Sequence, residues 1–191
     1  MSHPDASELG KLVRQFYPAS MASHDPGYGT ATEPVRREAR RMAAQQDRSA
    51  WQAFLQRIQE GLPDSGLWDQ PSLLHYPCRN VRVYLPHSPM GTDVQDAVVL
   101  LASVLGPFHA FYASHHRYEG KRVVETTTWF APLPERFRLH EERLDALASS
   151  ELGSTRLTAD VLLAPLPDIQ VENVRPGETR LIHCLFTSNL W

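Results

Sequence analysis

The sequence predicts an α+β protein: a ferredoxin-like (βαββαβ) sandwich over residues 78–191, preceded by an N-terminal helical extension over residues 1–70. Three observations lead to this fold class. Before residue 62, apolar residues recur at helical spacings of three and four. After residue 78 the period shortens toward two, which is typical of half-buried strands. The predicted elements then run strand, helix, strand, strand, helix, strand, with one additional strand before the last.

The N-terminal layer begins with an amphipathic helix from Asp5 to Tyr17, which Pro18 ends. Residues 18–34 are rich in Pro, Gly, Ser and Thr and form a predicted loop. From Pro34 to Gly61 we expect one bent helix or two consecutive helices. The apolar stripes of this helical region are formed by Val35, Ala39, Met42, Ala43, Trp51, Phe54, Leu55, Ile58 and Leu62.

The predicted sandwich begins with a strand over residues 80–85, where Val81, Val83 and Leu85 alternate with polar neighbours. Residues 92–105 are apolar around most of a helical circumference, so we expect a buried helix there, on the same sheet face as a second helix over residues 134–151. Residues 108–118 and 122–130 predict a hairpin, and residues 157–163 and 179–186 predict strands. Because the last strand is apolar on both parities, the N-terminal helices should cover part of the second sheet face.

Composition limits the class of protein. The chain has 191 residues, 42% of them hydrophobic, with a formal net charge of -3, which fits one soluble folded domain over residues 1–191 and does not favour nucleic acid as a partner. The first residues lack the apolar core of a signal peptide, and no apolar stretch approaches the ~20 residues of a membrane helix. With two cysteines, Cys78 and Cys184, the expected compartment is the cytosol, without a membrane partner.

Sequence motifs for catalysis, cofactors and metals fail their spacing tests. The segment HEERL at residues 140–144 lacks the second histidine of a metalloprotease helix, and no serine elbow, phosphate loop or dinucleotide fingerprint is present. Neighbouring strand residues point to opposite faces, so His115 and His116 cannot share an ion, and His109 lies roughly 20 Å from His115 along a strand at ~3.3 Å per residue. We therefore expect no bound metal and no cofactor.

The hairpin offers one candidate polar pair. With a two-residue turn at Gly120 and Lys121, His116 would lie opposite Glu125, and Tyr112 opposite Trp129, on a common face. Such a His/Glu pair is either an acid/base couple or an ordinary cross-strand polar contact. The aromatic residues Tyr112 and Trp129 are either partner anchors or core residues beneath the N-terminal helices.

A second candidate surface is the arginine strip of the segment PVRREARRM. Arg36 and Arg40 are i, i+4 neighbours on the predicted helix, as are Arg37 and Arg41. This strip is either a solvated helix face or a docking site for phosphates or for an acidic protein surface. No aromatic residues interleave with it as base-stacking platforms, which argues against nucleic acid.

Read whole, the chain resembles the small α+β immunity proteins that bacteria encode beside polymorphic toxins. The segments that carry this likeness are NVRVYLPHSPMGTDVQD, ASVLGPFHAFYASHH and TRLIHCLFTS, spread over residues 75–188. The resemblance implies a non-catalytic cytosolic protein that binds a toxin domain and blocks it. It transfers no functional residues to this chain.

Two other functions stay open at this point. One is a small enzyme that uses the sheet-face pair His116 and Glu125, and the other is a homo-oligomeric scaffold that assembles through a sheet edge or through exposed aromatic residues. The predicted partner-binding residues are the hairpin face and the arginine strip, and we favour the hairpin: Tyr112, His116, Glu125, Trp129, Arg36 and Arg40.

Overall fold

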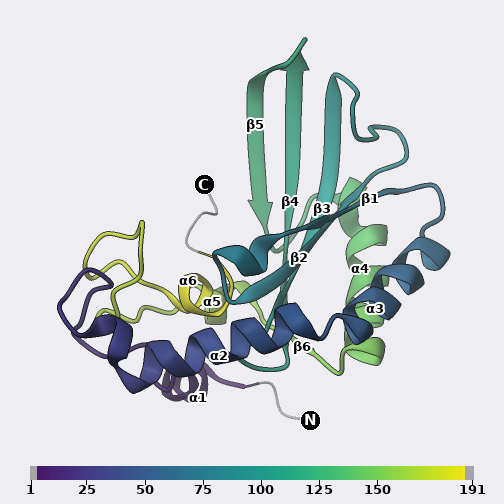
Figure 1. Cartoon of the computed structure of the whole chain (residues 1–191). Coiled ribbons are helices and arrows are strands. Elements are labelled where there is room, and N and C mark those ends of the chain that lie inside the picture. Colours follow the sequence, from purple (N-terminus) through teal and green to yellow (C-terminus); the bar gives the residue numbers. More distant parts are fainter. Residues whose placement is uncertain (1–3, 188–191) are drawn as a thin grey trace.

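The structure is a computed structural model that describes residues 4–187. Its centre is an antiparallel sheet whose strands β1 to β5 lie in sequence order, and a short strand β6 pairs in parallel with β4 (Figure 1). This arrangement confirms the predicted mixture of helices with an antiparallel sheet, including the hairpin. The strands are β1 (Gly66–Gln70), β2 (Cys78–Tyr84), β3 (Val94–Ser103), β4 (Phe108–Glu119), β5 (Arg122–Phe130) and β6 (Thr155–Arg156).

Residues 4–61 are largely helical, as predicted, although the helical layer expected over residues 1–70 also contains the strand β1. The expected helix after Asp5 is present but shorter, and the region from residue 32 to 61 forms two helices that meet at Asp47 and Arg48. The helix predicted over residues 134–151 is confirmed as α4. The helices are α1 (Ala6–Val13), α2 (Thr32–Gln46), α3 (Ser49–Gly61), α4 (Glu135–Glu151), α5 (Ala159–Leu162) and α6 (Leu181–Leu185), with short 3₁₀ helices η1 (Tyr28–Thr30) and η2 (Ser72–Leu74).

The helix predicted over residues 92–105 is wrong, because this segment is β3, the central strand of the sheet. Its residues from Ala97 to Leu101 are all at most 1% exposed, so both faces of the strand are covered. A strand buried on both faces loses the alternation that distinguishes it from a buried helix. The strand–helix–strand order of a ferredoxin-like βαββαβ unit is therefore not formed, since β2 leads directly into β3.

The two strands predicted near the C-terminal end are also wrong. Residues 157–163 contain the short helix α5, and residues 181–185 form the helix α6. The buried residues of α6 lie on more than one side of the helix, namely Leu181, Ile182, Cys184 and Leu185. The apolar residues on both parities therefore reflect a helix enclosed by other segments, not a strand covered on two faces.

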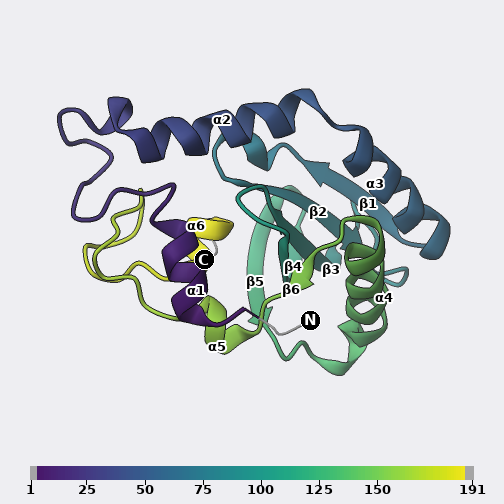
Figure 2. The same ribbon diagram turned by 90° about the horizontal axis from the view of Figure 1, so that it is seen from below.

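Helices lie on both faces of the sheet (Figure 2), and the side chains between the helices and the sheet form two apolar cores, one on each face. Core A lies between the sheet and the helices α3 and α4, and includes Phe54, Leu100 and Phe137, each 0% exposed. Core B lies between the sheet and the segments α1, α5 and α6, and includes Val13 and Val99. The expectation that N-terminal helices cover part of the second face is thus met by α1. None of the helices within residues 4–187 is long and apolar enough to cross a membrane.

The hairpin register differs from the predicted one by a single residue. A β-bulge between Arg117 and Tyr118 shifts the pairing, so that His116 faces Thr126 and Glu125 faces Arg117. The same shift places Tyr112 opposite Phe130 and Trp129 opposite Ala113. Because a one-residue slip exchanges the two faces of a strand, the predicted His116–Glu125 and Tyr112–Trp129 pairs do not exist.

Candidate functional site

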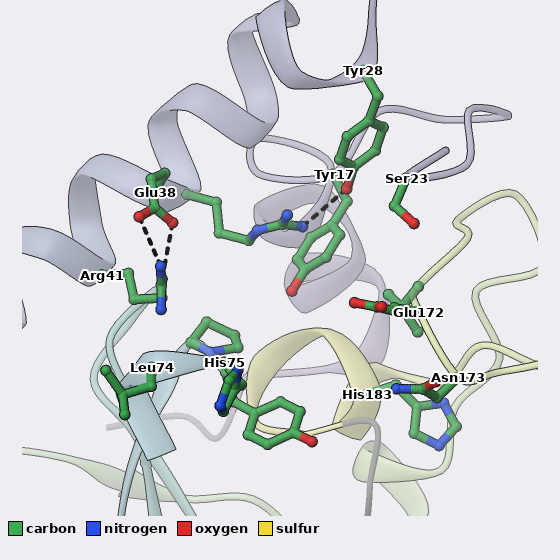
Figure 3. A pocket seen from close by; sticks show the side chains of 14 residues that line it. Tyr17, Ser23, Tyr28, Glu38, Arg41, Leu74, His75, Glu172, Asn173 and His183 are labelled. Atoms are coloured by element: carbon green, nitrogen blue, oxygen red, sulfur yellow. Dashed lines mark hydrogen bonds and ion pairs between the residues drawn. The ribbon is translucent and has the colours of Figure 1, made fainter. Parts of the chain in front are cut away.

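A polar pocket of about 420 Å³ lies where the N-terminal segment, α2 and the C-terminal segments meet (Figure 3). One wall comes from α2 and the loop before it, the opposite wall from the chain around η2, and the third from residues 171–183. We call this hollow the Arg37 pocket. Its lining residues are Tyr17, Ser23, Tyr28, Arg37, Glu38, Arg41, Leu74, His75, Tyr76, Pro77, Val171, Glu172, Asn173 and His183.

Local sequence explains how α2 presents its arginines to this pocket. Gly27 has a φ of 85°, a conformation that glycine adopts readily, and it leads into η1, which carries Tyr28. The helix α2 then begins at Thr32, and Pro34 suits its first turn because the N–H groups of that turn have no partner within the helix. Arg37 and Arg41 follow one turn apart and share the side of the helix that faces the pocket.

Arg37 is a half-buried cation in the pocket wall. Its guanidinium carbon lies 4.3 Å from the centre of the Tyr17 ring, and its Nη1 donates a hydrogen bond of 3.1 Å to the Tyr28 hydroxyl (Figure 3). Within residues 4–187, no carboxylate lies at ion-pair distance from this guanidinium. An arginine stays charged at any working pH, so Arg37 presents a positive charge that no ion pair within residues 4–187 neutralises directly, although the carboxylates of Glu38, which Arg41 binds, and of Glu172 also line the pocket.

Arg41, one turn along α2, has its partners within the protein. It bonds to both carboxylate oxygens of Glu38, at 2.9 and 2.8 Å, and also donates to the Leu73 carbonyl. The hydrogen bond from Arg41 lowers the pKa of the Glu38 carboxyl below its ordinary value. Gln45 donates to the same Leu73 carbonyl at 2.7 Å, so this side of α2 anchors the helix to η2. Arg41 therefore has a structural role, which leaves Arg37 as the cation available to a ligand.

The pocket floor is formed by Tyr17, which joins the N-terminal and C-terminal segments. Its hydroxyl donates a 2.9 Å hydrogen bond to the Cys184 carbonyl. Burial raises the pKa of Tyr17 above its ordinary value, and burial likewise raises the pKa of the Cys184 thiol, so both groups are neutral at physiological pH. Neither group is a ready nucleophile, because the reactive forms are the phenolate and the thiolate.

His183 closes the pocket on the side of Asn173 (Figure 3). Its Nδ1 accepts the backbone N–H of Arg180 at 3.1 Å. Burial, and then the nearby Arg180 charge, lower the pKa of His183, so the ring is neutral at physiological pH and carries its hydrogen on Nε2. His183 is therefore a neutral hydrogen-bond donor. Among the described lining residues, no hydroxyl or thiol is hydrogen-bonded to a histidine, which is the contact that activates a nucleophile.

The predicted arginine strip divides between two surroundings. Arg37 and Arg41 line the pocket, whereas Arg36 and Arg40 are exposed beside it. Arg36 donates a 3.2 Å hydrogen bond to the Gln15 carbonyl. The structure thus places the strip at the rim and wall of one hollow, although the sequence did not indicate which of its arginines face inward.

The predicted hairpin surface is not a single surface. Tyr112 and His116 lie on the sheet face of core B, whereas Glu125 and Trp129 lie on the face of core A. Trp129 is half-buried against Phe137 of α4, with ring centres 5.7 Å apart, and Tyr112 packs against core B. Both aromatic residues pack against the cores, as the second alternative predicted. Trp129, however, packs beneath α4 and not beneath an N-terminal helix.

Two close histidine–carboxylate pairs in the structure were not predicted from the sequence. His109 Nε2 on β4 lies 2.8 Å from Asp145 Oδ1 on α4, and His115 Nδ1 lies 2.9 Å from Asp96 Oδ1. Asp96 and His115 face each other on β3 and β4, so the second pair follows directly once residues 94–103 are assigned to a strand. In the part of the chain that the structure describes, no group of three His, Cys, Asp or Glu residues is placed to hold a metal ion.

Most of the Arg37 pocket could not be read from local sequence. Tyr17 and Cys184 meet across 167 residues, and His75, Glu172 and His183 come from loops and a short helix without a motif. The one indication in the sequence was the i, i+4 spacing of Arg37 and Arg41, which predicts that both side chains point in a common direction but does not predict a cavity.

Comparison of the chain with protein-family models, with curated proteins and with solved structures gives no match.

Proposed function

We propose that this chain is a binding protein that receives an acidic side chain of a protein partner in the Arg37 pocket. The observation that carries this proposal is the unpaired, half-buried Arg37 guanidinium, held in place by Tyr17 and Tyr28. Charges removed from water are normally paired, and the planar fork of arginine matches a carboxylate. A carboxylate from the partner would give this guanidinium the direct ion pair that it lacks within residues 4–187.

The surroundings of the pocket support a protein as the partner. Arg36 and Arg40 are exposed on the same helix and extend the positive charge beyond the hollow. Such rim charges accelerate encounter with an acidic surface, whereas the buried guanidinium contributes the anchoring contact. We therefore propose the toxin domain implied by the resemblance to immunity proteins as the partner, with a cytosolic and non-catalytic role for this chain.

The pocket can be tested with a minimal acidic probe, the peptide acetyl-Gly-Glu-Gly-amide. We expect Arg37→Met to weaken its binding by about tenfold or more, because a charge-assisted contact is lost. The measurement is an NMR titration at low ionic strength. Arg122→Met is the matched control, since Arg122 is an equally cationic residue at the exposed hairpin turn, away from the pocket.

Thermal unfolding of each variant verifies that the fold survives. Arg37→Lys retains the charge without the fork, so its affinity should fall between those of the wild type and Arg37→Met. Equal affinity of the wild type and Arg37→Met for the peptide would refute the proposed site.

The toxin partner needs a separate experiment. The probe is the C-terminal domain of a secreted protein encoded beside this chain, and we expect the purified chain to capture that domain and to block its toxicity on co-expression. Arg37→Met should weaken the capture more than Arg40→Met does, because Arg40 lies at the exposed rim. Full toxicity in the presence of the wild-type chain would contradict the immunity function.

A further inference from the structure

A second hollow, of about 760 Å³, adjoins the Arg37 pocket. The two hollows share Asn173 and His183, so these two side chains form a common wall. We call the second hollow the Arg180 pocket. Its lining residues are Leu163, Pro165, Asn173, Val174, Arg175, Gly177, Glu178, Thr179, Arg180 and His183.

The Arg180 pocket has more cationic than acidic side chains in its lining. Arg175 and Arg180 line it together with one acidic residue, Glu178, and neither arginine has a carboxylate at ion-pair distance within the described chain. Arg180 Nη1 donates to the Leu163 carbonyl at 2.9 Å, which fixes its side chain along the wall. The Arg175 side chain makes no hydrogen bond or ion pair to the residues described. Two more guanidinium groups are therefore available to an anion.

The same pocket contains a buried hydroxyl without a partner. Thr179 is 0% exposed, and its Oγ1 has no hydrogen-bond partner within residues 4–187. Buried hydroxyls are normally satisfied, so this one is an exception that the described residues do not explain; because it has no exposed surface, a ligand in the hollow does not reach it. The lining segment is ordered by its own contacts, since Gln170 Nε2 donates to the Val174 carbonyl at 2.9 Å.

We propose that the two pockets form one bipartite site for a partner segment that carries two carboxylates. One carboxylate binds Arg37, and the other binds Arg175 and Arg180 beyond the wall formed by Asn173 and His183. The neutral His183 side chain lines both hollows and so lies between the two carboxylates. This inference rests on the proposed function, because it assumes that Arg37 receives an acidic side chain.

The test compares peptides with one and with two glutamates. The probes are acetyl-Gly-Glu-Gly-amide and a series acetyl-Glu-Glyₙ-Glu-amide with spacers of increasing length, titrated by NMR at low ionic strength. At the matching spacer we expect the two-glutamate peptide to bind about tenfold tighter or better, because the second contact becomes intramolecular. Arg175→Met and Arg180→Met should abolish this gain and leave unchanged the one-glutamate affinity that is read from the resonances of the residues around Arg37.

Three variants keep the outcome interpretable. Arg175→Met removes no described contact, so it tests the second pocket without disturbing the fold, and Arg122→Met again controls for charge. If no spacer improves affinity while Arg37→Met still weakens both peptides, the bipartite site is overturned and the proposed function stands. If neither peptide depends on Arg37, the proposed function itself fails, and the bipartite site with it.

Discussion

His140 shows how burial sets the chemistry of a single residue. It lies on α4 at 7% exposure, with Nε2 3.0 Å from the Ser65 hydroxyl oxygen, and its Nδ1 has no hydrogen-bond partner within residues 4–187. Burial, followed by the charges of Arg143 and His87, lowers the pKa of this imidazole from its ordinary 6.5. The folded protein therefore disfavours the protonated ring relative to the unfolded chain.

A pH dependence of stability follows from this pKa. Because the unfolded chain binds more protons near pH 6, we expect the free energy of unfolding to fall as pH decreases from about 7 to 5. The pKa values of His116 and His183 are also lowered, chiefly by burial, and act in the same direction. Chemical denaturation at several pH values measures the slope.

The matched variants are His140→Gln and His24→Gln, since His24 is exposed. We expect the first to reduce the slope and the second to leave it unchanged. A wild-type stability that is flat or rising toward pH 5 would contradict the assignment. Carboxyl groups with lowered pKa values, such as that of Asp145, lose their contribution only at lower pH, so they do not obscure this window.

At the scale of elements, α2 carries the pocket arginines and needs a fixed position. The guanidinium of Arg79 on β2 provides part of it, because its Nη2 donates to the Ala44 carbonyl and, at 2.8 Å, to the Asp47 carbonyl. These carbonyls at the end of a helix have no partner within the helix. The Arg79 guanidinium also lies 5.5 Å from the Trp51 ring at the start of α3. One side chain thus connects β2 with α2 and α3.

Removal of this connection should affect stability and binding together. We expect Arg79→Met to lower the free energy of unfolding by about 1–3 kcal/mol, because two helix carbonyls lose a donor. It should also weaken the one-glutamate peptide slightly, since α2 becomes less firmly placed. Arg57→Met, which removes an exposed arginine from α3, is the control and should change stability by less than about 0.5 kcal/mol. Indistinguishable stabilities of the two variants would show that Arg79 does not hold α2.

The elements also show which parts of the fold local sequence can predict. The helices α1, α3 and α4 follow from periodicity, because each buries one face against a core, and the hairpin follows from its two β-prone runs around a turn. The apolar stripe predicted on α2 is wrong, since Val35 is 53% and Met42 42% exposed and Pro34 is the buried residue of that helix. The strand β3 and the helix α6 are enclosed on more than one side, which removes the periodicity that separates strand from helix. The hairpin register depends on the bulge between Arg117 and Tyr118, which the residue types of the turn do not predict. The predicted His116–Glu125 pair is wrong for that reason.

At the scale of the whole molecule, the sheet separates two cores that differ in how far apart their residues lie in the sequence. Core A draws on residues from Trp51 to Ala148, whereas core B joins Leu9 to Phe186. Both cysteines belong to core B and are free thiols at 0% exposure. Burial raises the pKa of Cys78 to about 12 and that of Cys184 above its ordinary value.

Thiol reactivity should therefore report the opening of core B. We expect both cysteines to resist Ellman's reagent in native buffer and to react fully in denaturant, because a buried neutral thiol is a poor nucleophile. The measurement is the modification rate as a function of denaturant concentration, with Phe54→Ala as a variant that weakens core A by about 3–5 kcal/mol. If both cores unfold as one unit, this variant should accelerate thiol modification. Rapid modification of the native protein would contradict the enclosed position of both thiols.

Because α1 packs against α6, core B can form only after both helices have been synthesised. Arg14 and Asp168 form a 2.8 Å ion pair across 154 residues, and Tyr17 reaches the Cys184 carbonyl in the same region. On a ribosome, core A can assemble once residue 148 has emerged, but core B must wait for residues 181–186. During that interval the apolar side of α1 and one face of β3 have no cover. During synthesis these apolar surfaces are therefore exposed to chaperones and to mispairing until α6 has emerged.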